Sequence, residues 1–273
     1  MFHLLGGARG KVVLTLATRF RRNRLPRREF GIGSAKVPTT ALDERGSSHD
    51  LLQERHLRYM RVGKRALDIA VALVGLSVFA VLLPLLAVAI KLDSPGPVFF
   101  SQVRIGIDRR RRRRSDCPVH GERRRVVYPG RPFRLYKLRT MRVDAEAAGP
   151  RWATPRDDRV TRVGRWLRRT RLDEFPQFWN VLKGEMSVIG PRPERLCFIR
   201  QLEQQVPHYH DRLVVLPGIT GLAQVLNGYD TDVESVRRKV ALDRHYIQRM
   251  GWREDLRILL LTLRTVVAGR GAH

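Results

Sequence analysis

The most constraining feature of this 273-residue sequence is a stretch of 22 residues without a charge, Ile69–Ile90. As a straight helix it would be about 33 Å long at 1.5 Å per residue, close to the hydrocarbon thickness of a bilayer. Both flanks are rich in arginine and lysine, so the positive-inside tendency places both ends on the cytoplasmic side. Pro84 predicts a kink after Leu83, because proline removes a helical hydrogen bond and clashes with the preceding turn.

Three structures are compatible with this stretch. A re-entrant helix, which bends at the proline and leaves the membrane on the side it entered, satisfies both the basic flanks and the kink. A single transmembrane span and a helix buried in a protein core are the alternatives. We expect the re-entrant membrane helix and its flanks to occupy residues 58–94.

The positive charge is concentrated in two segments. The formal net charge is +27, from 53 Lys+Arg against 26 Asp+Glu. Residues 1–65 hold 15 basic and 5 acidic residues, a net of +10, and residues 107–131 hold 10 arginines and 3 acids, a net of +7. Such segments suit phosphate-rich partners, namely nucleic acid, anionic lipid or phosphorylated substrates. We expect residues 1–57 to form a basic, disordered tail and residues 107–131 to form a surface loop inserted into the fold.

Residues 95–273 predict a helix-rich domain with a small β element. The two cysteines exclude a disulfide scaffold and favour a reducing compartment. Short strands are expected at Val98–Val103 and within Pro132–Met141. Helical spacing of apolar residues marks four later segments: Arg159–Leu172, Pro176–Gly184, the region of Val240–Ile247, and a closing segment from Asp255 that suits either core packing or a membrane interface.

Asp173 and Glu174 stand immediately before one of these predicted helices, which holds Pro176 in its first turn. Phe175, which precedes the proline, is the expected cap residue. A helix N-terminus keeps carboxylates ionised and attracts phosphates. An ionised carboxylate is what a nucleophile or a Mg²⁺ ligand must be. Simple N-terminal capping, a common role of acids at such positions, is the alternative.

Arg192 lies between two prolines in Gly190–Pro193. A guanidinium held by a rigid backbone loses little entropy when it binds a phosphate. The alternative is a solvated arginine in an ordinary proline turn. Near the C-terminus, Asp243 and His245 lie beside apolar helical positions, where a lone histidine is more often a surface or core residue than a ligand.

A series of motifs carries a resemblance to a known family. KRALDIAVALVGL, LDSPGPVFFSQVRIG, FRLYKLRTM, LDEFPQFWNVLKGEMSVIGPRP, LPGITGLAQV and KVALDRHYI follow one another in the order typical of the bacterial sugar transferases. These are the monotopic phosphoglycosyl transferases, also called polyprenyl-phosphate hexose-1-phosphate transferases, and the resemblance covers about residues 61–268. It implies an α-rich α+β fold: a compact monotopic membrane domain with a kinked re-entrant helix, interfacial amphipathic helices and a small β element.

The resemblance also implies a reaction. A UDP-sugar donor gives its sugar-1-phosphate to a membrane polyprenyl phosphate, such as undecaprenyl phosphate, and UMP leaves. Asp173 is implied as the nucleophile, which forms a phosphosugar-aspartyl intermediate, and Glu174 as a ligand of Mg²⁺ that bridges the diphosphate. The catalytic domain, residues 95–273, is then expected on the cytoplasmic face of the bacterial inner membrane.

Further residues match basic or acidic positions of the family. Lys137, Arg139 and Arg192 are implied as phosphate-binding residues, and Asp243 matches an acid near the site. One departure concerns the kink, since family members commonly have serine before the proline and this chain has Leu83. The chain resembles the minimal catalytic form with a basic tail added.

Two rival functions were weighed against this one. A membrane-tethered nucleic-acid-binding protein would explain the charge, but the arginine runs have almost no interleaved aromatics and no helix-turn-helix or zinc-finger pattern is present. We therefore expect no specific nucleic-acid partner, and anionic membrane lipid instead. A phosphatase with an aspartate nucleophile is the second rival. A dimer is one compatible oligomeric state.

Overall fold

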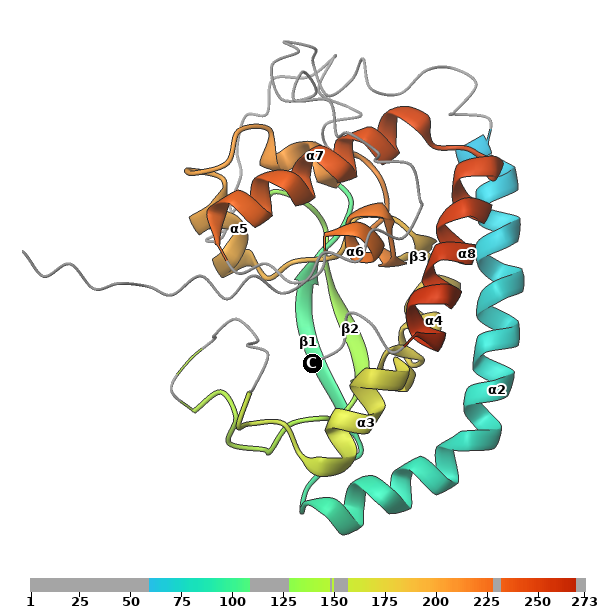
Figure 1. Ribbon diagram of the computed structural model, residues 1–273, viewed down its shortest axis with the longest axis vertical. Helices are drawn as coiled ribbons and strands as arrows, with labels where there is room; N and C mark the ends of the chain where they lie inside the picture. The colour runs from blue at the N-terminus through green and yellow to red at the C-terminus, as the bar shows by residue number, and fades with distance from the viewer. Residues whose placement is uncertain (1–58, 109–127, 148, 150–156, 228–231, 269–273) are drawn as a thin grey trace, which may run out of the picture. The chain divides into compact units, whose positions relative to one another are not determined.

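The computed structural model describes residues 59–108, 128–147, 149, 157–227 and 232–268 (Figure 1). Its helices are α2 (Lys64–Asp93), α3 (Arg162–Thr170), α4 (Gln177–Leu182), α5 (Leu196–Leu202), α6 (Leu222–Leu226), α7 (Val233–Arg249) and α8 (Trp252–Val267). Its strands are β1 (Phe99–Ile105), β2 (Pro132–Leu138), β3 (Ser187–Ile189) and β4 (Gly218–Thr220). The prediction of a helix-rich chain with a small β element is confirmed.

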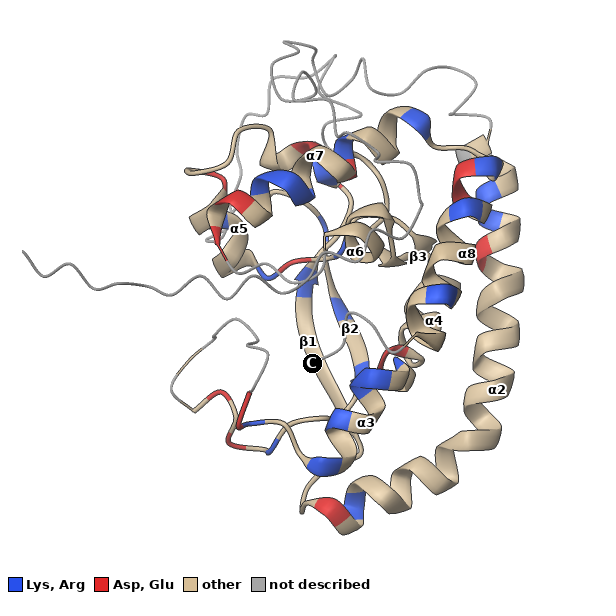
Figure 2. Cartoon of the chain, in the orientation of Figure 1, with Lys and Arg blue, Asp and Glu red and all other residues tan. Residues whose placement is uncertain are grey.

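Helix α2 contains the apolar stretch and runs for 30 residues, with Pro84 inside it. Figure 1 shows that α2 bends in its C-terminal part. Pro84 is the proline within α2, and its missing N–H and ring clash account for a bend. Figure 2 shows the charges of α2 gathered at its two ends. Within the described residues, α2 alone is long and apolar enough to cross a membrane, and the fold-back within one leaflet stays a prediction.

One face of α2 is an uncovered apolar stripe. Its residues recur every three or four positions and are all exposed: Val74, Val78, Val81, Leu85, Val88 and Leu92. A helix in the core of a soluble domain would bury such a face, because exposed apolar surface of this extent is unfavourable in water. The stripe therefore argues against the core-helix alternative and suits contact with lipid.

The opposite face of α2 packs closely on α4. A Cβ atom at Gly75 would overlap the ring of Phe178, so glycine is needed for the two helices to approach this closely. Next along α2, the Phe79 ring lies 6.3 Å from the Phe175 ring and 6.5 Å from the Phe99 ring, measured between centroids. The apolar helix is thus joined directly to the segment that carries Asp173 and Glu174.

Strands β1 and β2 form an antiparallel hairpin, with Phe99 opposite Leu138 and Ile105 opposite Pro132. The pairing continues beyond the strands, since the Gly106 N–H donates to the Arg131 carbonyl at 2.9 Å. The arginine-rich segment therefore joins the two strands of one hairpin. Of the predicted loop over residues 107–131, residues 109–127 lie outside the described residues, as does the predicted tail over residues 1–57.

The short parallel pair β3–β4 lies in the main hydrophobic core. Its hydrogen bonds extend into Gly190–Pro193, here called the GPRP loop: the Gly190 N–H donates to the Thr220 carbonyl at 2.9 Å and the Gly218 N–H donates to the Pro191 carbonyl at 2.9 Å. These bonds fix the backbone before Arg192, and the Ile105 N–H fixes the backbone after it by donating to the Glu194 carbonyl at 3.0 Å.

Buried polar contacts hold the first turns of α2 to the C-terminal helices. The Lys64 ammonium donates to Asp255 of α8 at 2.6 Å and to the Tyr246 hydroxyl of α7 at 3.0 Å. Asp68 accepts a hydrogen bond from the Ser187 hydroxyl at 2.9 Å. A buried charge pair is costly to break, because the remaining charge would be left without a partner. These contacts fix the N-terminal end of α2 on the domain.

Candidate active site

A sharp turn of the backbone presents the two predicted catalytic carboxylates. Helix α3 ends at Thr170, and Arg171 then adopts a left-handed conformation with φ of 61°. A short 3₁₀ turn, Leu172–Glu174, follows and holds both acids. Positive φ is unfavourable for arginine and is common where a functional side chain must be aimed.

The prediction that Phe175 caps the next helix is wrong. Phe175 has helical dihedral angles, φ −56° and ψ −37°, and Pro176 is the N-cap residue of α4. The preceding 3₁₀ turn continues into α4, and the Phe175 ring is held against Phe178 with centroids 5.5 Å apart. Tertiary packing has therefore overridden the usual preference of a residue before proline for extended backbone.

Asp173 and Glu174, here called the acid pair, face two cations from distant parts of the chain. Glu174 Oε1 accepts from Lys137 Nζ at 2.8 Å and from Arg192 Nη2 at 2.9 Å. Lys137 Nζ also lies 3.8 Å from Asp173 Oδ2. Both acids are buried, at 4% and 6% exposure. Among the described residues, Asp173 Oδ1 has no hydrogen-bond partner.

The acid pair is electrostatically asymmetric. Burial raises the pKa of Asp173 above its ordinary value, and the Lys137 ammonium only partly opposes this. Burial acts in the same direction on Glu174, but Lys137 and Arg192 outweigh it and hold the pKa of Glu174 well below its usual range. Burial also lowers the pKa of Lys137, against the attraction of Glu174. Two neighbouring carboxylates whose pKa values are pushed apart are suited to different roles.

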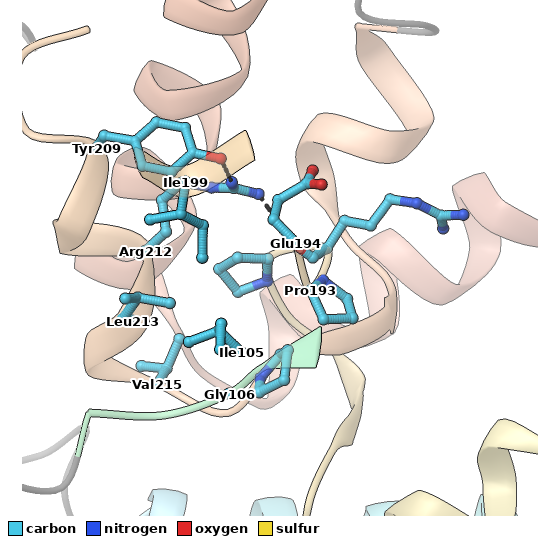
Figure 3. Close-up of a pocket in the computed structure, with 12 residues that line it drawn as sticks. Ile105, Gly106, Pro193, Glu194, Ile199, Tyr209, Arg212, Leu213 and Val215 are labelled. Atoms are coloured by element: carbon cyan, nitrogen blue, oxygen red, sulfur yellow. Dashed lines mark hydrogen bonds between the residues drawn. The ribbon is translucent and has the colours of Figure 1, made fainter. Parts of the chain in front are cut away.

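Behind the GPRP loop, Asp243 reaches the site through a second arginine. Arg212 Nε donates to Asp243 Oδ2 at 2.6 Å, and Arg212 Nη2 donates to the Arg192 carbonyl at 3.1 Å. Figure 3 shows this guanidinium between the Tyr209 hydroxyl, to which it donates at 3.1 Å, and the loop. Asp243 is therefore linked to Arg192 through Arg212, which donates a hydrogen bond to the Arg192 backbone carbonyl.

Glu194, directly after the loop, is held by cations of its own. It accepts from Lys239 Nζ at 2.6 Å and lies 3.6 Å from Arg104 Nη1. Burial raises the pKa of Glu194, but Lys239, Arg212 and Arg104 outweigh it and lower the pKa to about 2. We call Arg212, Asp243, Glu194 and Lys239 the rear cluster. Of these residues, sequence reasoning identified only Asp243.

Arg139 lies elsewhere. Its guanidinium donates to the carbonyls of Ser94 at 2.7 Å and Pro95 at 2.5 Å, just after the C-terminal end of α2. These carbonyls occupy both terminal nitrogens of the guanidinium. The structure brings Lys137, the acid pair and Arg192 together but does not bring Arg139 to them, and its phosphate-binding role stays a prediction.

The acid pair suits Mg²⁺ shared with a substrate. Within the part of the chain that the structure describes, no group of three or more His, Cys, Asp or Glu side chains could hold a metal on its own. Magnesium is commonly bound by only one or two carboxylates together with substrate phosphates. Glu174, whose lowered pKa keeps it ionised, fits that arrangement as a single carboxylate ligand.

The site combines two buried acids with two cations. It lies on a domain that packs against a helix with an exposed apolar face, as is typical of a membrane-associated protein. The chain belongs to the bacterial sugar transferase family, whose profile matches residues 59–114 and 110–269. The resemblance read from the motifs is confirmed.

Relatives at about 40% identity carry specific names. A protein of Aeromonas hydrophila named "UDP-N-acetylgalactosamine-undecaprenyl-phosphate N-acetylgalactosaminephosphotransferase" is 42% identical over 210 residues, which are 77% of this chain and 45% of that protein. A "UDP-glucose:undecaprenyl-phosphate glucose-1-phosphate transferase" of Caulobacter vibrioides is 40% identical over 212 residues, 77% of this chain and 72% of that protein. The protein of the same name from Escherichia coli is 40% identical over 206 residues, 74% of this chain and 40% of its own length. The chain thus spans less than half of the Aeromonas and Escherichia proteins.

Proposed function

We propose that the protein transfers a sugar-1-phosphate from a UDP-sugar to a polyprenyl phosphate, such as undecaprenyl phosphate. The observation that carries the proposal is the buried acid pair facing Lys137 and Arg192, with one Asp173 oxygen that accepts no hydrogen bond from the described residues. The names of the Aeromonas and Caulobacter relatives support the lipid acceptor and a nucleotide-sugar donor. A relative of Rhizobium leguminosarum named "Exopolysaccharide production protein PSS" supports a place in bacterial polysaccharide or glycoconjugate synthesis.

The reaction proceeds in two displacements at one phosphorus. An Asp173 carboxylate oxygen attacks the sugar-linked phosphorus of the donor, and the bond to UMP breaks with its electron pair leaving on UMP. A phosphate oxygen of the polyprenyl acceptor then attacks the same phosphorus and releases the Asp173 carboxylate. A covalent step divides one displacement between two bulky anions into two easier ones. Burial raises the pKa of Asp173, and a carboxylate of higher pKa is, once ionised, the stronger nucleophile of the two acids.

The other site residues manage negative charge. Lys137 and Arg192 exchange their contacts with Glu174 for contacts with the substrate phosphates, because both cations sit beside the position that the attacked phosphorus must occupy. Glu174, ionised throughout, is the protein ligand of Mg²⁺ in this proposal. Bound Mg²⁺ would neutralise the diphosphate and so favour departure of UMP.

The membrane supplies the acceptor. The exposed stripe of α2 contacts lipid, and α2 packs directly on the segment carrying the acid pair, so the site lies near the lipid phosphates. We place the domain at the cytoplasmic face of the bacterial inner membrane, with α2 re-entrant and anionic lipid around the basic segments. Specific nucleic-acid binding is not part of the proposal.

The topology can be tested by labelling. After both native cysteines are replaced by serine, Val62→Cys and Ser94→Cys are each introduced alone. A re-entrant α2 leaves both positions unlabelled by a membrane-impermeant thiol reagent in intact cells and labelled after permeabilisation. Labelling of one position alone in intact cells would establish a full span instead.

The activity is tested by UMP release across a panel of UDP-sugars, with undecaprenyl phosphate and Mg²⁺. At least one donor is expected to give UMP in step with a lipid-linked sugar diphosphate. Omission of the acceptor limits release to one UMP per enzyme if Asp173 is covalently loaded. Continued release of UMP without acceptor would point to a phosphatase, and no release from any donor would overturn the proposal.

A further inference from the structure

Gln177, the first residue of α4, has an unusual environment. It is 2% exposed, and its side-chain nitrogen Nε2 has no hydrogen-bond partner among the described residues. Buried polar groups are nearly always paired, because an unmet donor loses its water without compensation. Such an exception needs an explanation, and here it lies one turn from the acid pair.

The backbone places Gln177 on the same face as Glu174 of the acid pair. The Phe175 N–H donates to the Leu172 carbonyl at 3.3 Å and the Phe178 N–H donates to the Phe175 carbonyl at 3.0 Å, so turns of the 3₁₀ type run through this segment. Residues three apart along such turns lie above one another. Glu174 and Gln177 are three apart.

That face lies against β2. At one end, Lys137 of β2 donates to Glu174 at 2.8 Å. At the other end, Asn180 of α4 donates to the Arg134 carbonyl of β2 at 2.8 Å and accepts from the Tyr136 N–H at 3.2 Å. Gln177 comes between Glu174 and Asn180 on this face, and it is buried there.

Two buried atoms close together in the sequence thus lack a hydrogen-bond partner among the described residues: the acceptor Asp173 Oδ1 and the donor Gln177 Nε2. We propose that Gln177 is a further catalytic residue, whose amide donates a hydrogen bond to a non-bridging oxygen of the sugar-linked phosphate. This inference rests on the proposed function. The phosphoryl group would supply what each group lacks, since its phosphorus bonds to the carboxylate oxygen and its oxygen accepts from the amide. A donor already in place gains most when charge develops on that oxygen.

The structure offers Gln177 no bond to stabilise the fold through Nε2. Removing the amide should therefore impair the reaction without impairing folding. A buried glutamine with a purely structural role would show the reverse, a loss of stability with catalysis retained. The two roles are separable in one set of measurements.

The experiment compares Gln177→Met with wild type, since methionine has a similar unbranched length and no donor. We expect kcat for UMP release to fall by about 10²- to 10³-fold, as for loss of one preorganised donor, with KM changed less than about threefold. The melting temperature should stay the same or rise. Gln224→Met is the stability control, because Gln224 Nε2 donates to the Ile219 carbonyl at 2.7 Å and its loss should lower the melting temperature.

A second readout does not need turnover. Orthovanadate mimics a phosphoryl group in transfer, and it should raise the melting temperature of wild type more than that of Gln177→Met. A kcat within threefold of wild type, or a fall in kcat matched by a fall in melting temperature, overturns the role of Gln177 while leaving the transferase proposal intact. If wild type releases no UMP from any donor, the transferase proposal fails and the vanadate comparison alone decides on Gln177.

Discussion

Two charged groups of the domain, the acid pair with its cations and the rear cluster, lie on either side of the GPRP loop and differ in how completely they are paired. In the rear cluster, Arg212 and Asp243 approach to 2.6 Å with side chains 3% and 2% exposed. In the acid pair, Lys137 stands 3.8 Å from Asp173, whose other oxygen is unpartnered. Tight pairing fixes a backbone, whereas an incompletely paired carboxylate keeps an oxygen available to a substrate. The rear cluster therefore has the features of a structural support, and the acid pair has those of a reactive centre.

The largest effect is expected at Asp173. Asp173→Asn should reduce UMP release by at least about 10⁴-fold, because an amide cannot replace the nucleophile. Folding should be retained, since the removed charge is buried and poorly paired. Single-turnover UMP release and mass spectrometry for a phosphosugar adduct measure the first, and thermal unfolding the second. Asp144→Asn, at an exposed carboxylate, is the matched control. Substantial activity in Asp173→Asn would place the nucleophile elsewhere.

The rear cluster should show the opposite balance. Arg212→Met leaves Asp243 buried without its close partner, which should cost about 3–5 kcal/mol of unfolding free energy. Denaturant unfolding in detergent measures this. The double variant Arg212→Met/Asp243→Asn should recover part of the loss, because it also removes the buried charge that Arg212 balances. Unchanged stability in the single variant would contradict a scaffold role for the pair.

Acid should weaken the rear cluster through Glu194. Its pKa of about 2 in the folded chain lies below its ordinary value of 4.5, so Glu194 contributes stability that is present above pH 4.5 and lost as the pH falls toward 2. Between pH 6 and pH 3 this loss amounts to about 2 kcal/mol. Unfolding curves at both pH values should therefore differ less in Glu194→Gln than in wild type. An equal pH dependence in the two proteins would show that Glu194 is not held as described.

Arg192 joins the two groups, and the smallest effect is expected there. Arg192→Lys keeps the charge but loses the planar fork, and should lower kcat/KM by about tenfold. Stability should change little, because the guanidinium side chain is 37% exposed and the loop is held through its backbone. Steady-state kinetics with a fixed donor measure the effect, with Arg142→Lys at an exposed position as control. A kcat/KM equal to that of wild type would show that Arg192 does not bind phosphate.

The sequence predicted the acid pair and its cations because they lie in dense local motifs. Asp173, Glu174 and Arg192 belong to one continuous block, and Lys137 to a recognisable strand motif. Local sequence patterns likewise predicted short strands close to β1 and β2, though not their pairing, and helical spacing predicted α3, α7 and α8.

What the sequence did not predict depends on contacts between distant elements. Arg212 and Lys239 come from a 3₁₀ turn and from α7, and nothing in their local spacing marks them as partners of Asp243 and Glu194. Glu194 had the clearest signal, since it directly follows the GPRP loop. Arg139 likewise contacts the carbonyls that follow α2 because of tertiary packing. Its motif, in which it follows Lys137 by two residues, does not predict this contact.

Helix α2 is fastened to the domain at both of its ends, by Lys64 on Asp255 at the start and by Arg139 on the carbonyls of Ser94 and Pro95 just past the finish. Because both of its ends are held, α2 cannot pivot about either end. The distance between the acid pair and the lipid-facing stripe is therefore a fixed dimension of the protein rather than a variable of its motion. In the proposed reaction, a lipid acceptor would therefore have to bring its phosphate to one fixed height in the membrane.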